Sequence, residues 1–90
     1  MIEQAVIREI KEYIHVGDLE GLQALWSEYQ ETDFGRELAW ESIFQKVYLH
    51  AAHKKQRHIC EWLEGLFHDL DPIQQIGLRH VFPYARYLLR

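Results

Sequence analysis

Apolar residues recur along the chain at intervals of three and four, which is the spacing of one buried face of an α-helix. The first stripe consists of Ile2, Val6, Ile10, Tyr13 and Ile14. The second stripe consists of Leu19, Leu22, Leu25, Trp26 and Tyr29. Between them Gly17 can close one helix and Asp18 can cap the next, so this pattern predicts two helices joined by a short turn.

Two further stripes follow a break at Gly35, a residue that is free to adopt a positive φ. One stripe consists of Trp40, Ile43, Phe44, Val47, Tyr48 and Ala51, and the other of Ile59, Trp62, Leu63, Leu66 and Phe67. Asp71 before Pro72 predicts a helix start, because proline at the first helical position loses no needed N–H. This fifth helix is expected to stop by about His80, and Pro83 is expected to open a short sixth helix.

The same pattern decides the fold class. No segment alternates apolar and polar residues with a period of two, so no sheet is predicted. The connections are short, which makes consecutive helices antiparallel neighbours. At 90 residues the chain is expected to form a single domain, residues 1–90. The predicted fold is therefore all-α, with five to six short helices stacked as antiparallel helical hairpins.

Residues 51–65 resemble the end of the first helix and the second helix of an ankyrin repeat, and residues 17–26 resemble the same part. Ala51 and Ala52 match the small-residue pair of that family, and Lys55 stands where its turn glycine is usual. The matching apolar positions are Ile59, Trp62 and Leu63. The chain is thus similar, over most of residues 13–90, to the divergent ankyrin-like repeats found in large DNA viruses.

The resemblance implies a small stack of hairpins with a concave surface that binds another protein. Asp71, Pro72 and Ile73 fall on the Thr-Pro-Leu opening of the family, but the first two units lack this opening. The repeats are also unequally spaced, whereas the family keeps a period of about 33 residues. An unrelated helical bundle, or a small helical protein of the bacteriophage type, is the alternative.

Charge is unevenly distributed along the chain. The formal net charge is −4, yet the surplus of Asp and Glu lies in residues 1–45, and residues 46–90 carry a surplus of Lys and Arg. Such asymmetry can orient a partner. The single cysteine excludes an internal disulfide, and no apolar run is long enough for a signal peptide or a membrane span. We therefore expect an intracellular protein that does not bind membranes.

A dense group of metal-binding residue types lies between residues 48 and 67, namely His50, His53, His58 and Cys60. Structural zinc needs four such ligands in a tetrahedron. His58 and Cys60 are two residues apart on one helix, about 200° around its axis, so they cannot converge. Cys60 also lacks a base positioned beside it, and the chain has no glycine-rich phosphate loop. No metal, cofactor or catalytic residue is predicted, and the chain is not expected to be an enzyme.

Protein binding is the predicted function, in the form of a non-catalytic module that blocks or recruits its partner. The expected partner-binding residues are a basic turn, two later arginines and one tryptophan expected to be partly exposed: Lys54, Lys55, Arg57, His58, Arg79, Arg86 and Trp26. These residues favour a partner with an acidic surface. The opposite version uses the acidic half of the chain against a basic protein, through Glu28, Glu31, Asp33 and Glu37.

Two further alternatives are open. A small nucleic-acid-binding regulator would use residues 53–58 and the C-terminal arginines to contact phosphates, although a net charge of −4 disfavours it. A homodimer would form if the ends of a short hairpin stack left apolar faces uncovered.

Overall fold

The computed structural model describes residues 2–89, and every element in that range is a helix. The helices are α1 (Ile2–Val16), α2 (Leu19–Glu31), α3 (Asp33–Arg36), α4 (Trp40–His53), α5 (Arg57–His68), α6 (Pro72–Leu78) and α7 (Val81–Leu89). The all-α prediction is confirmed, with no strand in the described residues. The predicted count of five to six helices was too low, because the four-residue α3 has too few positions to show a periodic stripe.

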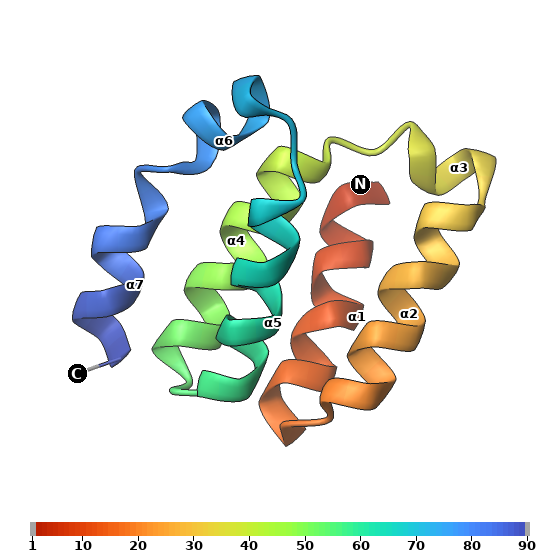
Figure 1. Cartoon of the computed structure of the whole chain (residues 1–90). Coiled ribbons are helices and arrows are strands. Elements are labelled where there is room, and N and C mark those ends of the chain that lie inside the picture. The colour runs from red at the N-terminus through yellow and green to blue at the C-terminus, as the bar shows by residue number, and fades with distance from the viewer. Residues whose placement is uncertain (1, 90) are drawn as a thin grey trace.

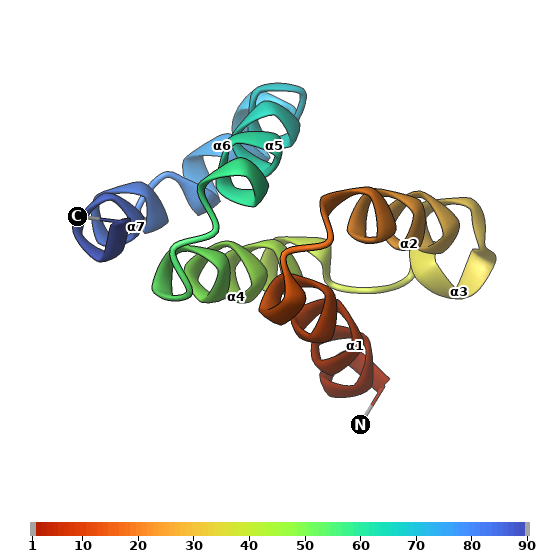
Figure 2. The same cartoon turned by 90° about the horizontal axis from the view of Figure 1, so that it is seen from below.

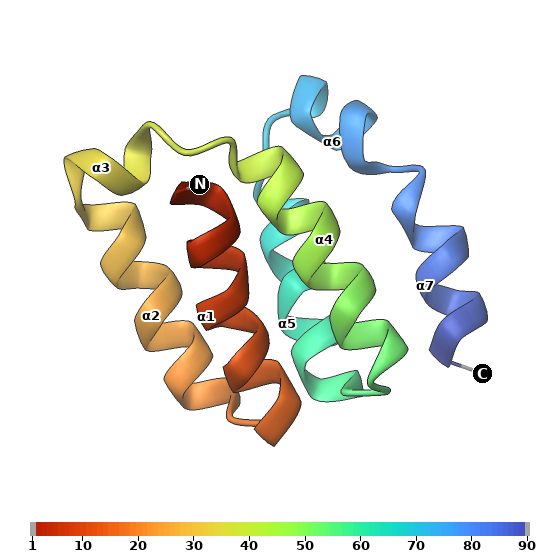
Figure 3. The same ribbon diagram turned by 180° about the vertical axis from the view of Figure 1, so that it is seen from behind.

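Helix α4 lies at the centre of the molecule and contacts α1, α5, α6 and α7. Figure 1 shows α1 and α2 running in opposite directions side by side, and α4 and α5 forming a second pair of this kind. Seen from below, the helices form two layers, with α1, α4 and α7 in one layer and α2, α5 and α6 in the other (Figure 2). The view from behind shows α1, α4 and α7 side by side (Figure 3).

The buried faces of these helices are the predicted stripes. Ile10, Ile14, Leu22 and Ile43 are fully buried, and the side chain of Ile2, which was assigned to the first stripe, lies outside the described residues. An aromatic cluster joins three helices. In it Phe82 of α7 packs at 5.3 Å from Tyr48 and at 4.6 Å from Phe67, measured between ring centroids.

The two turns between paired helices have the same backbone geometry. Gly17 takes a φ of +73° after α1, and Lys55 takes a φ of +59° after α4. In each turn the amide of the following residue bonds back to a carbonyl five residues earlier, Asp18 to Tyr13 and Gln56 to Ala51. This is the Schellman arrangement, which satisfies the last carbonyls of a helix. Lys55 therefore occupies a position where glycine is the less strained residue.

Lys55→Gly is expected to raise the free energy of unfolding by about 1 kcal/mol, because glycine adopts positive φ without a Cβ clash. Thermal denaturation should show a melting temperature about 4–8 °C higher. Lys54→Gly is the matched control, since Lys54 has an ordinary helical φ of −83°, and there glycine should destabilise the fold. An equal loss of stability in Lys55→Gly and Lys54→Gly would contradict the backbone strain assigned to Lys55.

The predicted helix starts after Asp18 and Asp71 are confirmed, whereas the last helix begins at Val81, two residues before the predicted Pro83. The carboxylate of Asp18 accepts a hydrogen bond from the Gly21 amide at 3.0 Å, and that of Asp71 accepts from the amides of Ile73 and Gln74. Helix α6 ends at Leu78, as expected, and α7 begins at Val81, so that Pro83 lies in its first turn. Amides in a first turn need no helical partner, so proline is tolerated there.

The role of Gly35 differs from the one that the sequence left open. Its φ is not positive, and instead it is a buried residue of α3 at a point where there is no space for a side chain. A Cβ at this position would lie 1.7 Å from the carbonyl oxygen of Tyr29. The missing side chain lets α3 fold back against the end of α2, and the Gly35 carbonyl accepts a hydrogen bond from Trp40 Nε1 at 2.6 Å.

Candidate binding groove

The predicted partner-binding residues do not form one surface. Lys54 and Lys55 are exposed in the turn between α4 and α5, and Arg57 and His58 are exposed at the start of α5. Arg79 lies between α6 and α7, at the opposite end of the molecule from that turn (Figure 1). Arg86 is exposed on α7 and is close enough to act on the Tyr48 hydroxyl.

Two residues of the basic turn have structural contacts. The Arg57 guanidinium donates a hydrogen bond to the backbone carbonyl of Leu89, which ties the turn to α7. His58 Nε2 lies 3.1 Å from the Gly17 carbonyl, which ties the same turn to the turn between α1 and α2. These contacts occupy two of the four side chains, and a partner-binding role for the turn stays a prediction.

Trp26 is buried, with 9% of its surface exposed, so the prediction of partial exposure was wrong. Trp40 covers it from α4, with a ring-centroid separation of 4.9 Å, and Trp62 covers it edge-on from α5 at 5.6 Å. The three tryptophans thus join α2, α4 and α5 at a point where α2 and α5 otherwise diverge (Figure 2).

A groove of about 540 Å³ opens beside this tryptophan cluster, between α2 on one side and α5 and α6 on the other, with α4 as its floor. We call it the aromatic groove. Its apolar lining consists of Trp26, Trp40, Phe44, Leu66, Leu70 and Leu78. Its polar lining consists of Ser27, Gln30, Glu31, Glu41, Asp69 and Gln74. The volume lies within the range of about 300–1,000 Å³ found for pockets that hold ligands.

Hydrogen bonds hold the walls of the groove in place. Trp40 is fixed by its bond to the Gly35 carbonyl, described above. On the other side the side-chain amide of Gln75 lies within 3.2 Å of three carbonyl oxygens, those of Phe67, His68 and Leu70. The Phe67 and His68 carbonyls belong to the end of α5, where regular helical partners are missing, and Leu70 follows that end. The amide therefore caps α5 and fastens α6 to it.

All ionisable residues that line the aromatic groove are acidic. Glu31, Glu41 and Asp69 are exposed at its rim, one from each of α2 and α4 and one from the end of α5. No Lys, Arg or His lines the groove among the described residues. The site therefore combines an aromatic floor with a negatively charged rim, a combination that favours a ligand with both apolar and cationic groups.

Buried ionisable groups of the core are held in their neutral forms. Burial raises the pKa of the Cys60 thiol to about 11, and the nearby Glu64 carboxylate adds to the shift. Cys60 is 1% exposed, so it is a neutral packed thiol at pH 7 and not a thiolate nucleophile. Within residues 2–89 no group of three or more His, Cys, Asp or Glu side chains is placed to hold a metal ion.

Exposed apolar side chains gather on the last two helices. Ile73 and Ile76 of α6 are 81% and 68% exposed, and Tyr84 and Tyr87 of α7 are also largely exposed. A homodimer contact of the predicted kind would involve this face, and it stays a prediction.

Sequence reasoning found part of the groove. It singled out Trp26, and it named Glu31 in the acidic alternative, but it did not connect either residue with Asp69. The leucines at 66, 70 and 78 follow ordinary helical spacing, so nothing in the pattern separates groove residues from core residues.

Comparisons with protein-family models, with curated proteins and with solved structures find no match for this chain. Across residues 2–89, none of the helices has the length and apolar character needed to cross a bilayer.

Proposed function

We propose that the chain is a non-catalytic protein-interaction module and that the aromatic groove holds a segment of its partner. The observation that carries this proposal is the aromatic floor enclosed by an acidic rim. Tryptophan is among the residues that contribute most to binding energy when it lies in a well-packed pocket. Binding in this groove is stoichiometric, and it acts by blocking or recruiting the partner.

The chemistry of the groove favours a particular partner segment. Large apolar side chains would pack on Trp40 and Phe44, and lysine or arginine residues beside them would face Glu31 and Asp69. The proposed partner is therefore a basic protein, as in the alternative in which acidic residues such as Glu31 form the binding surface. The version with an acidic partner relies on Lys54 and Lys55, which lie in the turn at the other end of α4.

An ankyrin-like stacking of hairpins is part of this proposal. It is supported by the side-by-side arrangement of α1, α4 and α7 and by the matching turns at Gly17 and Lys55. An intracellular location is also proposed, and the buried free thiol of Cys60 is compatible with a reducing compartment.

Peptides selected from a random displayed library on the full chain are expected to carry a large apolar residue flanked by Lys or Arg. The double variant Glu31→Lys/Asp69→Lys should bind these peptides at least about tenfold more weakly, since like charges would then face each other at the rim. Fluorescence of the groove tryptophans, measured during a peptide titration, gives the affinity.

The matched control is Glu20→Lys/Glu61→Lys, which changes the net charge by the same amount on the same two helices, at exposed sites outside the groove. It should keep the affinity of the native chain. Two results together would favour an acidic partner instead. The selected peptides would be acidic, and their binding would be lost when Lys54, Lys55 and Arg57 are changed to Glu. Equal loss in both Glu/Asp→Lys variants would show that only net charge matters.

A further inference from the structure

A second concavity, of about 450 Å³, lies between α1 and α4. Its lining includes Arg8, Lys11 and His15 from α1, and His50 and Lys54 from α4. Glu12 is the one carboxylate among its lining residues. We call this surface the basic strip. It faces away from the aromatic groove, on the side of the molecule where α1 and α4 lie next to each other (Figure 3).

Helical spacing explains how the strip is built. Arg8, Lys11 and His15 are three and four residues apart, so they lie on one face of α1, and His50 and Lys54 are four apart on α4. The two helices run in the same direction, which sets the two rows opposite each other (Figure 1). At 1.5 Å per residue the row on α1 is about 10 Å long.

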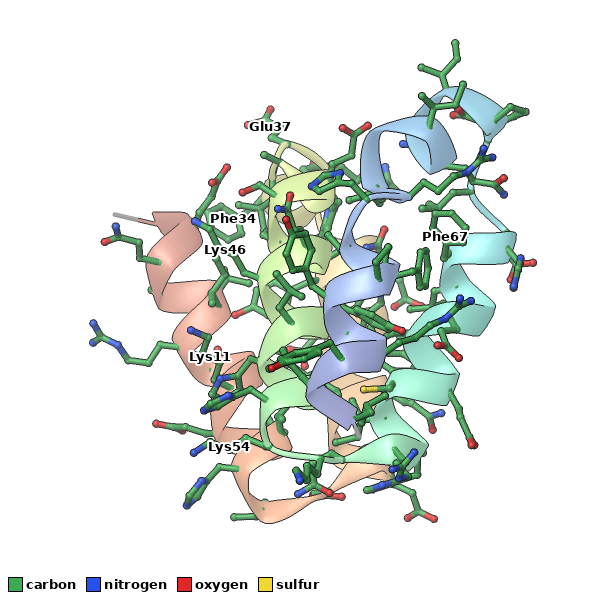
Figure 4. The ribbon with its side chains drawn as sticks, turned by 90° about the vertical axis from the view of Figure 1, so that its left-hand side faces the viewer. Lys11, Phe34, Glu37, Lys46, Lys54 and Phe67 are labelled. Atoms are coloured by element: carbon green, nitrogen blue, oxygen red, sulfur yellow. The ribbon has the colours of Figure 1, made fainter. Side chains whose placement is uncertain are left out.

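A further lysine extends the row on α4. Lys46 lies one turn before His50, and Figure 4 shows Lys46, Lys11 and Lys54 one after another along the face shared by α1 and α4. The strip thus collects cations from both halves of the chain, including two from the half with the acidic surplus.

The positive charge of the strip is only partly offset, by Glu12, and none of its side chains forms an ion pair among the described residues. The one ion pair within residues 2–89 joins Arg36 to Asp33 at 3.7 Å, far along the chain from the strip. His50, partly buried in the strip, has a pKa lowered first by burial and then by Lys11 and Lys54. His53 and His15 lower it further, so several cations act on one imidazole. In a chain of net charge −4, this is a local excess of positive charge.

We propose that the basic strip binds a compact ligand with two or more linked phosphate groups, an oligophosphate chain. Its length of about 10 Å exceeds the reach of one phosphate, and its lysines and arginine are the side chains that bind phosphate oxygens. Among the described residues no Phe, Tyr or Trp lines the strip, so a nucleobase would find no large aromatic platform there, only the imidazoles of His15 and His50. The phosphate chain itself is therefore the recognised group. This site does not depend on the function proposed for the aromatic groove.

Titration calorimetry of the full chain with inorganic tripolyphosphate at low salt tests the proposal. We expect saturable binding, with inorganic phosphate at least about tenfold weaker because it meets only part of the strip. ATP and tripolyphosphate should bind alike if only the phosphate chain is recognised. A lack of saturable binding by tripolyphosphate would overturn the proposal. Mixed-sequence single-stranded DNA binding more tightly than tripolyphosphate would do so as well, and would make the strip a nucleic-acid surface.

Charge-matched variants locate the site. Lys11→Glu/Lys54→Glu should weaken tripolyphosphate binding about thirtyfold or more, whereas Arg79→Glu/Arg86→Glu, with the same change in net charge, should leave it within about threefold. An equal loss of tripolyphosphate affinity in both variants would indicate general charge attraction and would overturn the assignment of the site to the basic strip. Lys11→Gln/Lys54→Gln is a second test should the first variant fold poorly, and circular dichroism checks folding in each case.

Nuclear magnetic resonance of the histidines gives a readout that general attraction would not produce. A phosphate chain in the strip places negative charge beside His50, opposite to the effect of Lys11 and Lys54, so the ligand should raise the pKa of His50. His68 and His80 lie outside the strip, and their chemical shifts should not respond to tripolyphosphate. A pKa of His50 that is unchanged at saturating tripolyphosphate would place the ligand elsewhere and overturn the proposal.

Discussion

Gly35→Ala is expected to lower the free energy of unfolding by about 3 kcal/mol, the upper end of the cost of overpacking a buried site. The added Cβ would lie 1.7 Å from the carbonyl oxygen of Tyr29 and 2.8 Å from the hydroxyl oxygen of Thr32. The Tyr29 carbonyl is backbone at the end of α2, so relief requires α3 to move away from α2. The melting temperature should fall by about 12 °C or more.

The same substitution should disturb the aromatic groove. Trp40 Nε1 donates its hydrogen bond to the Gly35 carbonyl, so a displaced α3 removes the contact that fixes Trp40 at the groove floor. The tryptophan fluorescence spectrum of the folded variant is therefore expected to shift to longer wavelength, as Trp40 becomes more exposed to water. Chemical denaturation followed by fluorescence measures both the stability and the spectrum.

Gly65→Ala is the matched control for this prediction. Gly65 lies on the exposed face of α5, and a Cβ there meets no atom within 4 Å. Alanine should raise the free energy of unfolding by about 0.5–1 kcal/mol, because glycine is the poorer helix former. A Gly35→Ala variant as stable as the native chain would show that α3 is not packed as described.

Raising the pH above 10 is expected to unfold the protein, and Tyr48→Phe should weaken this response. The Tyr48 hydroxyl is fully buried and donates a hydrogen bond to Glu64 Oε1 at 2.7 Å. Burial and this carboxylate raise the pKa of Tyr48 strongly above its ordinary value of 10. Burial and Glu64 also raise the pKa of Cys60 to about 11, from an ordinary value of 9. Both groups must keep their protons in the folded state.

The sign of the pH effect follows from these upward shifts. Below the unfolded pKa values of 9 and 10 the stabilising contribution is complete, and it is lost as the pH rises toward the higher folded values. Each group that loses its proton only on unfolding lowers the free energy of unfolding by about 1.4 kcal/mol per pH unit. Tyr48 and Cys60 together give about 3 kcal/mol per pH unit between pH 10 and 11.

A second tyrosine, Tyr29, adds to the alkaline response. Tyr29 donates a hydrogen bond to Glu9 Oε2 at 2.7 Å, which joins α2 to α1, and burial followed by Glu9 raises its pKa to about 12. Because Tyr29 is partly exposed, solvent screening makes its contribution smaller than that of Tyr48.

Urea denaturation at pH 7, 9, 10 and 11 measures the effect. Tyr48→Phe should cost about 1 kcal/mol at pH 7 through the lost hydrogen bond. Above pH 10 its free energy of unfolding should fall less steeply, by about 1.4 kcal/mol per pH unit. Tyr84→Phe, at an exposed tyrosine, is the control and should follow the native chain. The same alkaline slope in Tyr48→Phe and the native chain would rule out the role assigned to Tyr48.

Local chemistry made much of the fold predictable. The apolar stripes predicted the main helices. Gly17 closes α1 with a positive φ, and Asp18 and Asp71 cap the helices that follow them. The role of Gly35 was not predictable, because a glycine in a polar segment is compatible with two causes, a positive φ or a close contact. Only the packing of α3 on α2 separates these causes.

The candidate site was harder to predict because it depends on which helices are neighbours. Trp26 is buried by Trp40 and Trp62, which come from two other helices and are distant in sequence. Counting charges by halves of the chain likewise hid the basic strip, because Arg8 and Lys11 belong to the acidic half. The spacing of Arg8, Lys11 and His15 indicates one row of basic side chains on α1. The facing row on α4 follows only from the parallel packing of α1 and α4.

The hydrogen bonds of the Gln75 amide couple the local stability of α5 and α6. With seven residues, α6 is too short to persist alone in water, and the His68 carbonyl at the end of α5 accepts a hydrogen bond from the same amide. Loss of these hydrogen bonds would release both at once, so the end of α5 and all of α6 form one cooperative unit of local unfolding. A ligand that seats against Leu70 and Leu78 would thereby slow hydrogen exchange at the end of α5 as well as in α6.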